Sequence, residues 1–362
     1  MKKTLHKLLL LGLAVTVAAD FLSVCPDKCR CFWKSGNKEA DCSGSEAKFN
    51  QIPTGLSADI QILNLTGNNL SELTRVSLVD VPNLKSLLLK DCKLATIHRD
   101  ALQRLSIMIQ LDLAHNDLTT LDPDTFKETS NLRSILLNNN KLEKLDNGLF
   151  NNLLHLREVD LSNNHIHEIG VNTFINVPQI TKLNLENNRL EHLQIQTLNG
   201  LTSLSVLGLA NNPWRCDCNL KPFRDWVIIS QHLYTVPLEC VEPAHHRGKY
   251  WNTLGSDDFT CRPTIAYPSS LRLAGPNITL TCKVHGSPLP EVKLHFGSRL
   301  IAESYRHQGR VKYYVTDNNV GYDRWVNVTI VNAGADDNGE YVCEAKNPEG
   351  EEQKTFTLEL EV

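Results

Sequence analysis

Hydrophobic positions recur in one fixed frame of 24 residues between residues 58 and 212 of this chain. An apolar residue, most often leucine or isoleucine, stands at the first, fourth, sixth and eleventh positions of the frame, as in Leu132, Ile135, Leu137 and Leu142. The ninth position is polar or a thiol and is occupied in turn by Asn68, Cys92, Asn116, Asn140, Asn164, Asn188 and Asn212. A second apolar row keeps the same spacing, at Leu78, Leu102, Phe126, Phe150, Phe174 and Leu198.

A repeat of this length predicts a stacked solenoid, because one copy alone cannot bury its apolar face. The frame resembles the leucine-rich repeat, in which the segment x-L-x-L-x forms a short strand with its leucines inward. The intervening x residues then face outward and line a concave binding surface. We expect an α/β solenoid, a leucine-rich repeat horseshoe with seven 24-residue repeats over residues 58–212.

Two cysteine-rich segments flank the repeats and predict caps, since a stacked array leaves an apolar edge at each end. The N-terminal cap covers residues 20–57 and the C-terminal cap residues 213–262. Within the second cap, residues 219–229 read as a short helix with Phe223, Trp226 and Val227 on its inner side.

The remaining segment, residues 263–362, alternates apolar and polar residues over short stretches, which predicts a separate all-β domain. Its sequence D-N-G-E-Y-V-C resembles the strand-F signature of an immunoglobulin I-set sandwich. Tyr341 then stands two residues before Cys343, in the place of the tyrosine corner. The core tryptophan expected on the third strand is replaced by Leu294.

The N-terminus differs from the rest of the chain in composition. Three lysines precede an apolar run, and Val17 and Ala19 suit a cleavage site, so residues 1–19 read as a secretory signal peptide. An uncleaved anchor is the alternative, but the run is short for a bilayer. Cleavage leaves 34 basic and 41 acidic residues, a net charge of −7, and argues against nucleic acid as a partner. No later stretch is apolar over the length that a membrane span needs.

Eleven cysteines in a secreted chain imply disulfides. Spacing alone leaves three pairings open within each cap. A zinc site is the alternative for either cap, disfavoured by the oxidising route and the absence of the usual C-x₂-C spacing. Cys92 fills an inward position of the repeat, so we expect a buried free thiol there. An intermolecular bridge or a reactive thiol is the other interpretation.

The order of signal, capped repeats and one I-set domain resembles the leucine-rich repeat and immunoglobulin family of cell-surface proteins. It is most similar to the insect Kekkon proteins, through residues 29–44, 212–227 and 246–261. The resemblance implies the disulfides Cys25–Cys31, Cys29–Cys42, Cys216–Cys240, Cys218–Cys261 and Cys282–Cys343. Family members are typically single-pass adhesion or signalling modulators, and one Kekkon restrains an epidermal growth factor receptor. Since this sequence shows no span or tail, we expect a secreted protein or an ectodomain whose membrane span lies beyond it.

The x positions of the repeats supply candidate binding residues. Leu88 and Leu136 are apolar and flank Asp112. Asp112, Glu158, Asp160 and Glu186 form a loose acidic patch, and Asn184 is a further candidate at the central x position. One interpretation is a solvated, tolerant face. The other is a protein-binding patch with apolar anchors, which would fit a partner with a basic surface.

Four sequons predict N-glycosylation, at Asn64, Asn69, Asn277 and Asn327. Asn277 and Asn327 are expected to point outward from the β-domain. Asn64 would project from the concave face at its first repeat and push binding towards the later repeats.

Together these features predict an extracellular binding protein, without cofactor or metal, that modulates a receptor or a cell–cell contact; a homodimer is possible. A secreted immune recognition protein for microbial glycans or lipids is one alternative, disfavoured because the concave positions hold no aromatic residue. A matrix component is another. Catalysis is not expected: His115 and His165 lie beside the inward Asn row, and His167 completes no acid–base set. His245 and His246 are read as surface residues.

Overall fold

The computed structural model describes residues 25–44, 48–230, 237–266, 270–273, 275–301, 305–307 and 310–360. The chain divides into two compact units: Met1–Arg215 with Pro222–Asn252, and Cys216–Lys221 with Thr253–Val362. The segment expected as a signal peptide lies outside the described residues. Across the part of the chain that is described, no helix has both the length and the apolar character to cross a membrane.

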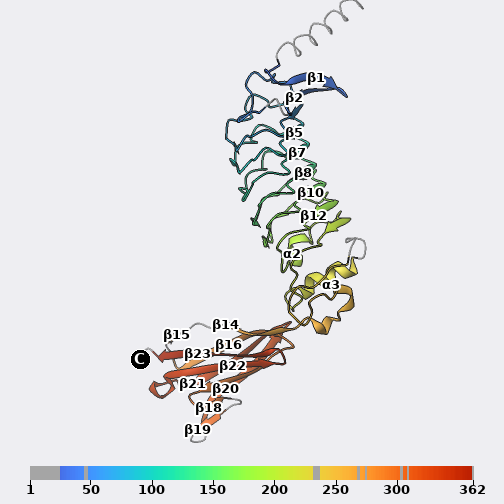
Figure 1. Ribbon diagram of the computed structural model, residues 1–362. Helices are drawn as coiled ribbons and strands as arrows, with labels where there is room; N and C mark the ends of the chain where they lie inside the picture. Colours follow the sequence, from blue (N-terminus) through green and yellow to red (C-terminus); the bar gives the residue numbers. More distant parts are fainter. Residues whose placement is uncertain are drawn as a thin grey trace, which may run out of the picture. The chain divides into compact units, whose positions relative to one another are not determined.

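A sheet of nine short strands runs through the first unit, with successive strands side by side (Figure 1). Its first two strands form an antiparallel hairpin in the N-terminal cap, and the strands of the repeats follow in parallel. In sheet order the strands are β1 (Arg30–Lys34), β2 (Asn37–Asp41), β3 (Ile62–Asn64), β5 (Ser86–Leu88), β7 (Gln110–Asp112), β8 (Ser134–Leu136), β10 (Glu158–Asp160), β12 (Lys182–Asn184) and β13 (Val206–Gly208).

Equivalent residues of the repeats meet directly across this sheet. Ile135 pairs with Leu111 on one side and with Val159 on the other, each 24 residues away. The middle residue of every repeat strand is buried, whereas the residues before and after it are at least partly accessible. The apolar frame is therefore the inner face of a solenoid with one coil per repeat, as the sequence predicts.

Short elements lie on the other side of several coils. These are the paired strands β4 (Glu72–Leu73) and β6 (Thr96–Ile97), the paired strands β9 (Lys144–Leu145) and β11 (Glu168–Ile169), and the helix α2 (Ile195–Leu198). Beneath them Phe150 stacks on Phe126 and Phe174, with ring centroids 5.6 and 5.2 Å apart. The second apolar row of the sequence is thus a continuous buried column.

The inward Asn row satisfies backbone groups between coils. Asn140 Nδ2 donates to Leu113 O and Leu137 O, at 2.9 and 3.0 Å, and its Oδ1 accepts from Leu118 N at 3.1 Å. Cys92 is a buried free thiol whose Sγ contacts Leu65 O at 3.1 Å. Burial raises the pKa of this thiol to about 11, so it stays protonated and unreactive at neutral pH.

The residue before each inward position has a left-handed backbone that the sequence analysis did not anticipate. Asn139, Asn163, Asn187 and Asn211 have φ between 54° and 57°, and His115 has φ 56°. Asn tolerates this conformation because its short side chain bonds locally, which accounts for the recurring Asn-Asn pairs. The first three coils carry other residues at this position, namely Gly67, Asp91 and His115, which also have positive φ.

The predicted C-terminal helix is present but shorter than expected. Helix α3 is Lys221–Ile229, and Asp217 Oδ1 accepts from Asn219 N at 2.9 Å just before it begins. Phe223 and Val227 are buried as predicted, but Trp226 is only half-buried. Arg224 is buried instead, because its guanidinium donates to the backbone oxygen of Trp251, at 2.7 Å from Nη2.

The second unit contains two five-stranded sheets (Figure 1). One has the order β14 (Cys261–Ala266), β16 (Asn277–Ser287), β21 (Asp323–Val331), β20 (Arg310–Val320) and β19 (Tyr305–His307). The other has the order β15 (Ser270–Leu273), β23 (Gly350–Leu360), β22 (Gly339–Asn347), β17 (Glu291–Phe296) and β18 (Arg299–Ile301). Short 3₁₀ turns occur at Trp251–Thr253, Ser256–Asp258 and Ala335–Asp337.

The core of this sandwich contains the features expected of an immunoglobulin fold. Tyr341 is fully buried, and its hydroxyl donates to Asp337 O at 3.0 Å, which forms the tyrosine corner. Leu294 is also buried and pairs with Cys343 across the sheet, so it fills the place of the missing tryptophan beside the disulfide. Trp325 lies outside the core and packs against the Lys283 ammonium, 5.4 Å from its ring centroid.

Disulfides close both caps and the sandwich. The structure contains the bridges Cys25–Cys31, Cys29–Cys42, Cys218–Cys261 and Cys282–Cys343. Cys216 and Cys240 are also disulfide-bonded. Cysteine bridges are thus concentrated where the repeat pattern ends.

Candidate functional site

One row of side chains runs down the outer face of the nine-stranded sheet and forms the candidate site. The parallel register aligns its members in the order Asn64, Leu88, Asp112, Leu136, Asp160, Asn184 and Gly208. We call this row the concave column. It contains the candidate residues that the sequence placed at the central x position, in the predicted order.

Polar members of the concave column also hold the backbone that follows each strand. Oδ1 of Asp112 accepts from Ala114 N at 3.0 Å, and Oδ1 of Asp160 accepts from Ser162 N at 3.0 Å. Asn184 makes the same bond to Glu186 N at 3.1 Å. These residues therefore have a local structural role besides any role in binding. The sequence signal for this structural role is an Asp or Asn two residues before the bonded amide.

The C-terminal end of the column opens into a hollow. A pocket of about 170 Å³ is lined by Glu158, Val159, Asp160, Lys182, Leu183, Asn184, Glu186, Val206 and Gly208, which we call the acidic hollow. Four predicted site residues meet here, namely Glu158, Asp160, Asn184 and Glu186. Lys182, Val206 and Gly208 belong to it as well, and the sequence analysis had not singled them out.

Gly208 makes room for two side chains that line this hollow. A Cβ added there would lie 2.4 Å from Asn184 Oδ1 and 3.0 Å from Glu186 Cγ. A side chain at this position would therefore require the Asn184 amide to move, although that amide accepts from Glu186 N. Glycine at the end of the concave column thus lets Asn184 and Glu186 take their observed positions.

The charge of the acidic hollow is only partly compensated. Lys182 Nζ lies 3.8 Å from Glu158 Oε1, and both side chains are well exposed, so this pair is weak. Asp160 Oδ1 is occupied by Ser162, through its backbone N and its hydroxyl. With three carboxylates and one ammonium, the hollow keeps a negative balance that favours a cationic group.

The apolar residues of the site are distributed differently from the prediction. Leu88 and Leu136 are half-buried, so only part of either side chain faces water. Val206 is 42% exposed and lies in the acidic hollow itself. The accessible apolar contact thus stands beside the carboxylates Glu158, Asp160 and Glu186, while Asp112 lies two strands away from Asp160.

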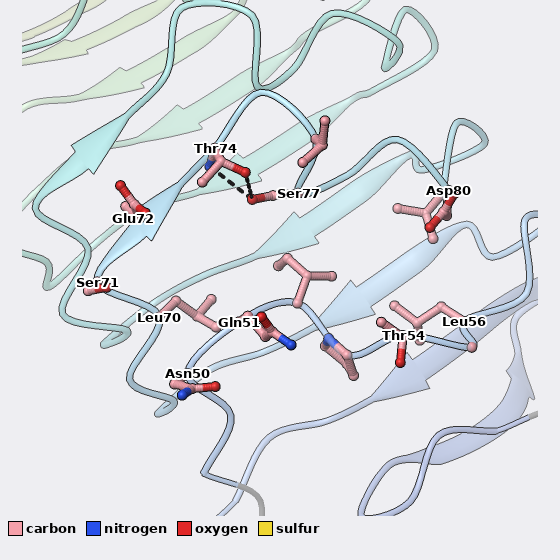
Figure 2. Close-up of a pocket in the computed structure, with 15 residues that line it drawn as sticks. Asn50, Gln51, Thr54, Leu56, Leu70, Ser71, Glu72, Thr74, Ser77 and Asp80 are labelled. Atoms are coloured by element: carbon pink, nitrogen blue, oxygen red, sulfur yellow. Dashed lines mark hydrogen bonds between the residues drawn. The ribbon is translucent and has the colours of Figure 1, made fainter.

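A second hollow, of about 350 Å³, lies between the end of the N-terminal cap and the first repeat. Figure 2 shows Asn50, Gln51 and Thr54 on one side and Glu72, Thr74 and Ser77 on the other. Ser77 Oγ bonds Thr74 N and Thr74 Oγ1, at 2.9 and 3.0 Å. Because these groups satisfy each other, this hollow offers fewer open hydrogen-bonding positions than its size suggests.

The histidines of the repeats form no metal centre within the described residues. Among these residues, the His, Cys and acidic side chains that approach one another closely enough to share a metal ion are Cys218, Cys261 and His285. His115 is exposed, and its Nε2 lies 3.4 Å from Asn139 Nδ2. The expectation for His246 was wrong, because it is buried, with its ring 4.2 Å from that of exposed His245.

The sequons differ in their surroundings. Asn64 is half-buried, and its Nδ2 lies 3.2 Å from Asp41 Oδ1 and 3.4 Å from Ser43 Oγ. Asn69 and Asn277 are exposed, while Asn327 is half-buried on the outer face of β21. The amide of Asn64 is therefore the more constrained acceptor for a glycan on the binding face.

Comparison with protein families identifies both parts of the chain. The leucine-rich repeat model matches residues 82–142, 110–166, 130–190 and 154–213, and the immunoglobulin I-set domain model matches residues 268–360. A search of curated proteins gave no significant match.

Both modules are typical protein–protein interaction modules of extracellular proteins and typically lack catalytic activity, and the disulfides agree with such a setting. Repeats followed by an I-set domain support the placement of this chain in the LRR-Ig family.

Proposed function

We propose that this protein binds an extracellular or cell-surface protein through the concave column, and thereby modulates a receptor or a cell–cell contact. The observation that carries the proposal is the acidic hollow, where three carboxylates and an exposed valine line one pocket together with Gly208. The similarity to the Kekkon proteins favours a modulator over a matrix component. The disulfides and sequon positions proposed from the sequence fit the same extracellular setting.

The chemistry of the hollow favours one kind of partner. A lysine or arginine side chain from the partner would place its charge between Asp160 and Glu186 and its alkyl stem against Val206. Charged contacts of this kind contribute to orientation and association rate, and a central anchor contributes most of the affinity. We infer a partner with a basic surface and a long cationic side chain.

The test compares two sets of charge changes in the full mature chain. The first combines Glu158→Gln, Asp160→Asn and Glu186→Gln, which remove three charges, and the amide that Asp160→Asn introduces can still accept the bond from Ser162 N. We expect secretion to be unaffected and the affinity for partners from an array of receptor ectodomains to fall about tenfold or more. Biolayer interferometry on the ectodomains that bind the wild-type chain measures it.

The matched control removes three charges elsewhere on the repeats, through Glu72→Gln, Glu128→Gln and Glu143→Gln. All three are exposed and lie outside the nine-stranded sheet. The affinity of this control should equal that of the wild type. Added salt should weaken the binding of the wild type and of the control, but not that of the variant without the three carboxylates of the acidic hollow. Equal affinities for the two sets would remove the acidic hollow from consideration as the binding site.

A further inference from the structure

A histidine lies beside one disulfide of the second unit, and a carboxylate lies beside that histidine. His285 Nε2 lies 3.5 Å from Cys218 Sγ, and His285 Nδ1 lies 2.9 Å from Asp323 Oδ1. Cys218 is bridged to Cys261. The order carboxylate, imidazole, sulfur is the arrangement by which proteins activate a cysteine, because the imidazole exchanges a proton with sulfur while the carboxylate orients the ring.

The other sulfur of this bridge also faces hydrogen-bond donors. Cys218 N donates to Cys261 Sγ at 3.1 Å, and Asn219 Nδ2 lies 3.8 Å from the same atom. A thiolate gains more from such donors than a disulfide sulfur does, since it carries a full negative charge. Both sulfurs therefore have surroundings that stabilise the reduced state, and this makes a disulfide easier to open.

The histidine is held by regular structure. His285 on β16 pairs directly with Asp323 on β21, and Lys283 Nζ lies 3.5 Å from Asp323 Oδ2. The Tyr322 ring packs edge-on against the imidazole, with centroids 6.2 Å apart. Because both partners stand on paired strands, the imidazole is placed before any reaction begins.

We propose that the Cys218–Cys261 bridge is a site of thiol–disulfide exchange with small extracellular thiols. An incoming thiolate attacks Cys261 Sγ and forms a mixed disulfide, while the Cys218–Cys261 bond breaks and its electron pair stays on Cys218. His285 supplies the proton that the Cys218 thiolate takes up. A second thiolate then attacks the mixed disulfide, which releases the oxidised thiol dimer and leaves Cys261 reduced.

The direction of attack follows from accessibility. Cys261 is 9% exposed and Cys218 only 1%, so an external thiol reaches Cys261 first. Asn347 Nδ2 donates to Cys261 O at 2.7 Å, which keeps the start of β14 in place when the bridge opens. The segment Cys216–Lys221 then loses its link to β14. Exchange thus loosens this segment and leaves the sandwich intact.

The sandwich bridge supplies an internal reference. Cys282 and Cys343 are fully buried within a cluster of apolar side chains and Tyr341. This environment stabilises neither an incoming nor a departing thiolate. The two bridges of the second unit should therefore differ strongly in their exchange rates.

The experiment treats the full mature chain with millimolar reduced glutathione at neutral pH, stops the reaction with iodoacetamide and maps the products by mass spectrometry. We expect glutathione on Cys261 and alkylation of Cys218 well before either group appears on Cys282 or Cys343. If Cys218 is alkylated no faster than Cys282, the proposal is overturned on the wild-type protein alone.

A pair of variants tests the part played by the histidine. His285→Gln should slow the opening of Cys218–Cys261 about tenfold, because the leaving thiolate loses its proton donor. His295→Gln alters another half-buried histidine, whose Nε2 lies near Glu344. Both residues belong to the sheet that does not contain His285, so this change should leave the rate unchanged. The exchange rate at Cys25–Cys31, measured in the same samples, reports whether either variant disturbs the chain generally. Equal rates for His285→Gln and wild type would refute the assigned role.

Discussion

The two units of this chain both bury apolar residues between strands, but they connect those strands differently. In the repeats, strands of three residues lie beside strands 24 residues away, always in parallel. In the sandwich, strands of up to 11 residues pair mostly antiparallel. Their partners can be distant in the sequence, since Ser270 pairs with Thr357 across the parallel strands β15 and β23. Solenoid stability is a sum of nearest-neighbour terms, whereas the sandwich depends on distant contacts formed together.

The comparison extends to the interior. The solenoid repeats one feature in every coil but that of Cys92, an inward Asn such as Asn140 that bonds backbone groups of its own and the preceding coil. The sandwich uses single devices, the Cys282–Cys343 bridge and the Tyr341 corner. Damage should therefore stay local in the first unit and spread through the whole domain in the second.

The largest expected effect comes from Phe150→Ala. Phe150 is fully buried between Phe126 and Phe174, so its removal leaves a cavity in the middle of the aromatic column. We expect the free energy of unfolding of the repeats to fall by about 3–5 kcal/mol. Hydrogen exchange resolved by peptide should show faster exchange in residues 126–185 and no change in the sandwich.

Phe150→Leu provides the matched control, because Leu102 and Leu198 occupy the same position in other coils. Its loss should be clearly smaller. An equal loss for the two variants would mean that the aromatic stack itself, rather than the buried volume, carries the stability.

Removal of the sandwich disulfide tests the opposite half of the comparison. The double change Cys282→Ala and Cys343→Ala opens a link between residues 61 apart and should cost about 2–4 kcal/mol. Unlike Phe150→Ala, it should raise hydrogen exchange across all strands of the second unit together. Protection retained in part of the sandwich would contradict its description as one cooperative unit.

An Asn row member should have a smaller and more local effect. Asn140→Ala leaves Leu118 N without its partner and deprives Leu113 O and Leu137 O of a donor. We expect a loss of about 1–3 kcal/mol in urea unfolding of the repeats. Asn140→Cys, which copies the residue found at Cys92, keeps a weak donor and should cost less. If both cost the same, the thiol at Cys92 contributes no hydrogen bond.

The sequence predicted the repeats because the 24-residue spacing recurs in every coil. Val159, Leu183 and their equivalents had to face inward together, and the concave column followed by counting. The sandwich was predicted from a few landmarks, chiefly Cys282, Cys343 and Tyr341, because its pairings join distant residues.

The site was harder to predict because it depends on what is missing from a repeat. Gly208 leaves the concave column without a side chain while the 24-residue frame continues, and only the structure shows that the side chains of Asn184 and Glu186 lie against it. The 24-residue spacing likewise gave the strand positions of Leu88 and Leu136. It did not give their burial, because that depends on neighbouring side chains. His246 was misplaced for the same reason.

The smallest expected effect concerns a gain in stability at His115. Its backbone is left-handed, with φ 56°, at the position where four later coils carry Asn. Since the histidine side chain is exposed there and reaches Asn139 only at 3.4 Å, His115→Asn should lower the backbone strain with little loss of packing. We expect the free energy of unfolding of the repeats to rise by about 0.5 kcal/mol in urea titrations.

His167→Asn is the control, because it changes an exposed histidine without a left-handed backbone and should bring no gain. An equal rise for both variants would show that composition, not backbone conformation, is responsible. The repetitive unit thus allows a test that the sandwich does not, because each of its positions is compared with the same position in neighbouring coils.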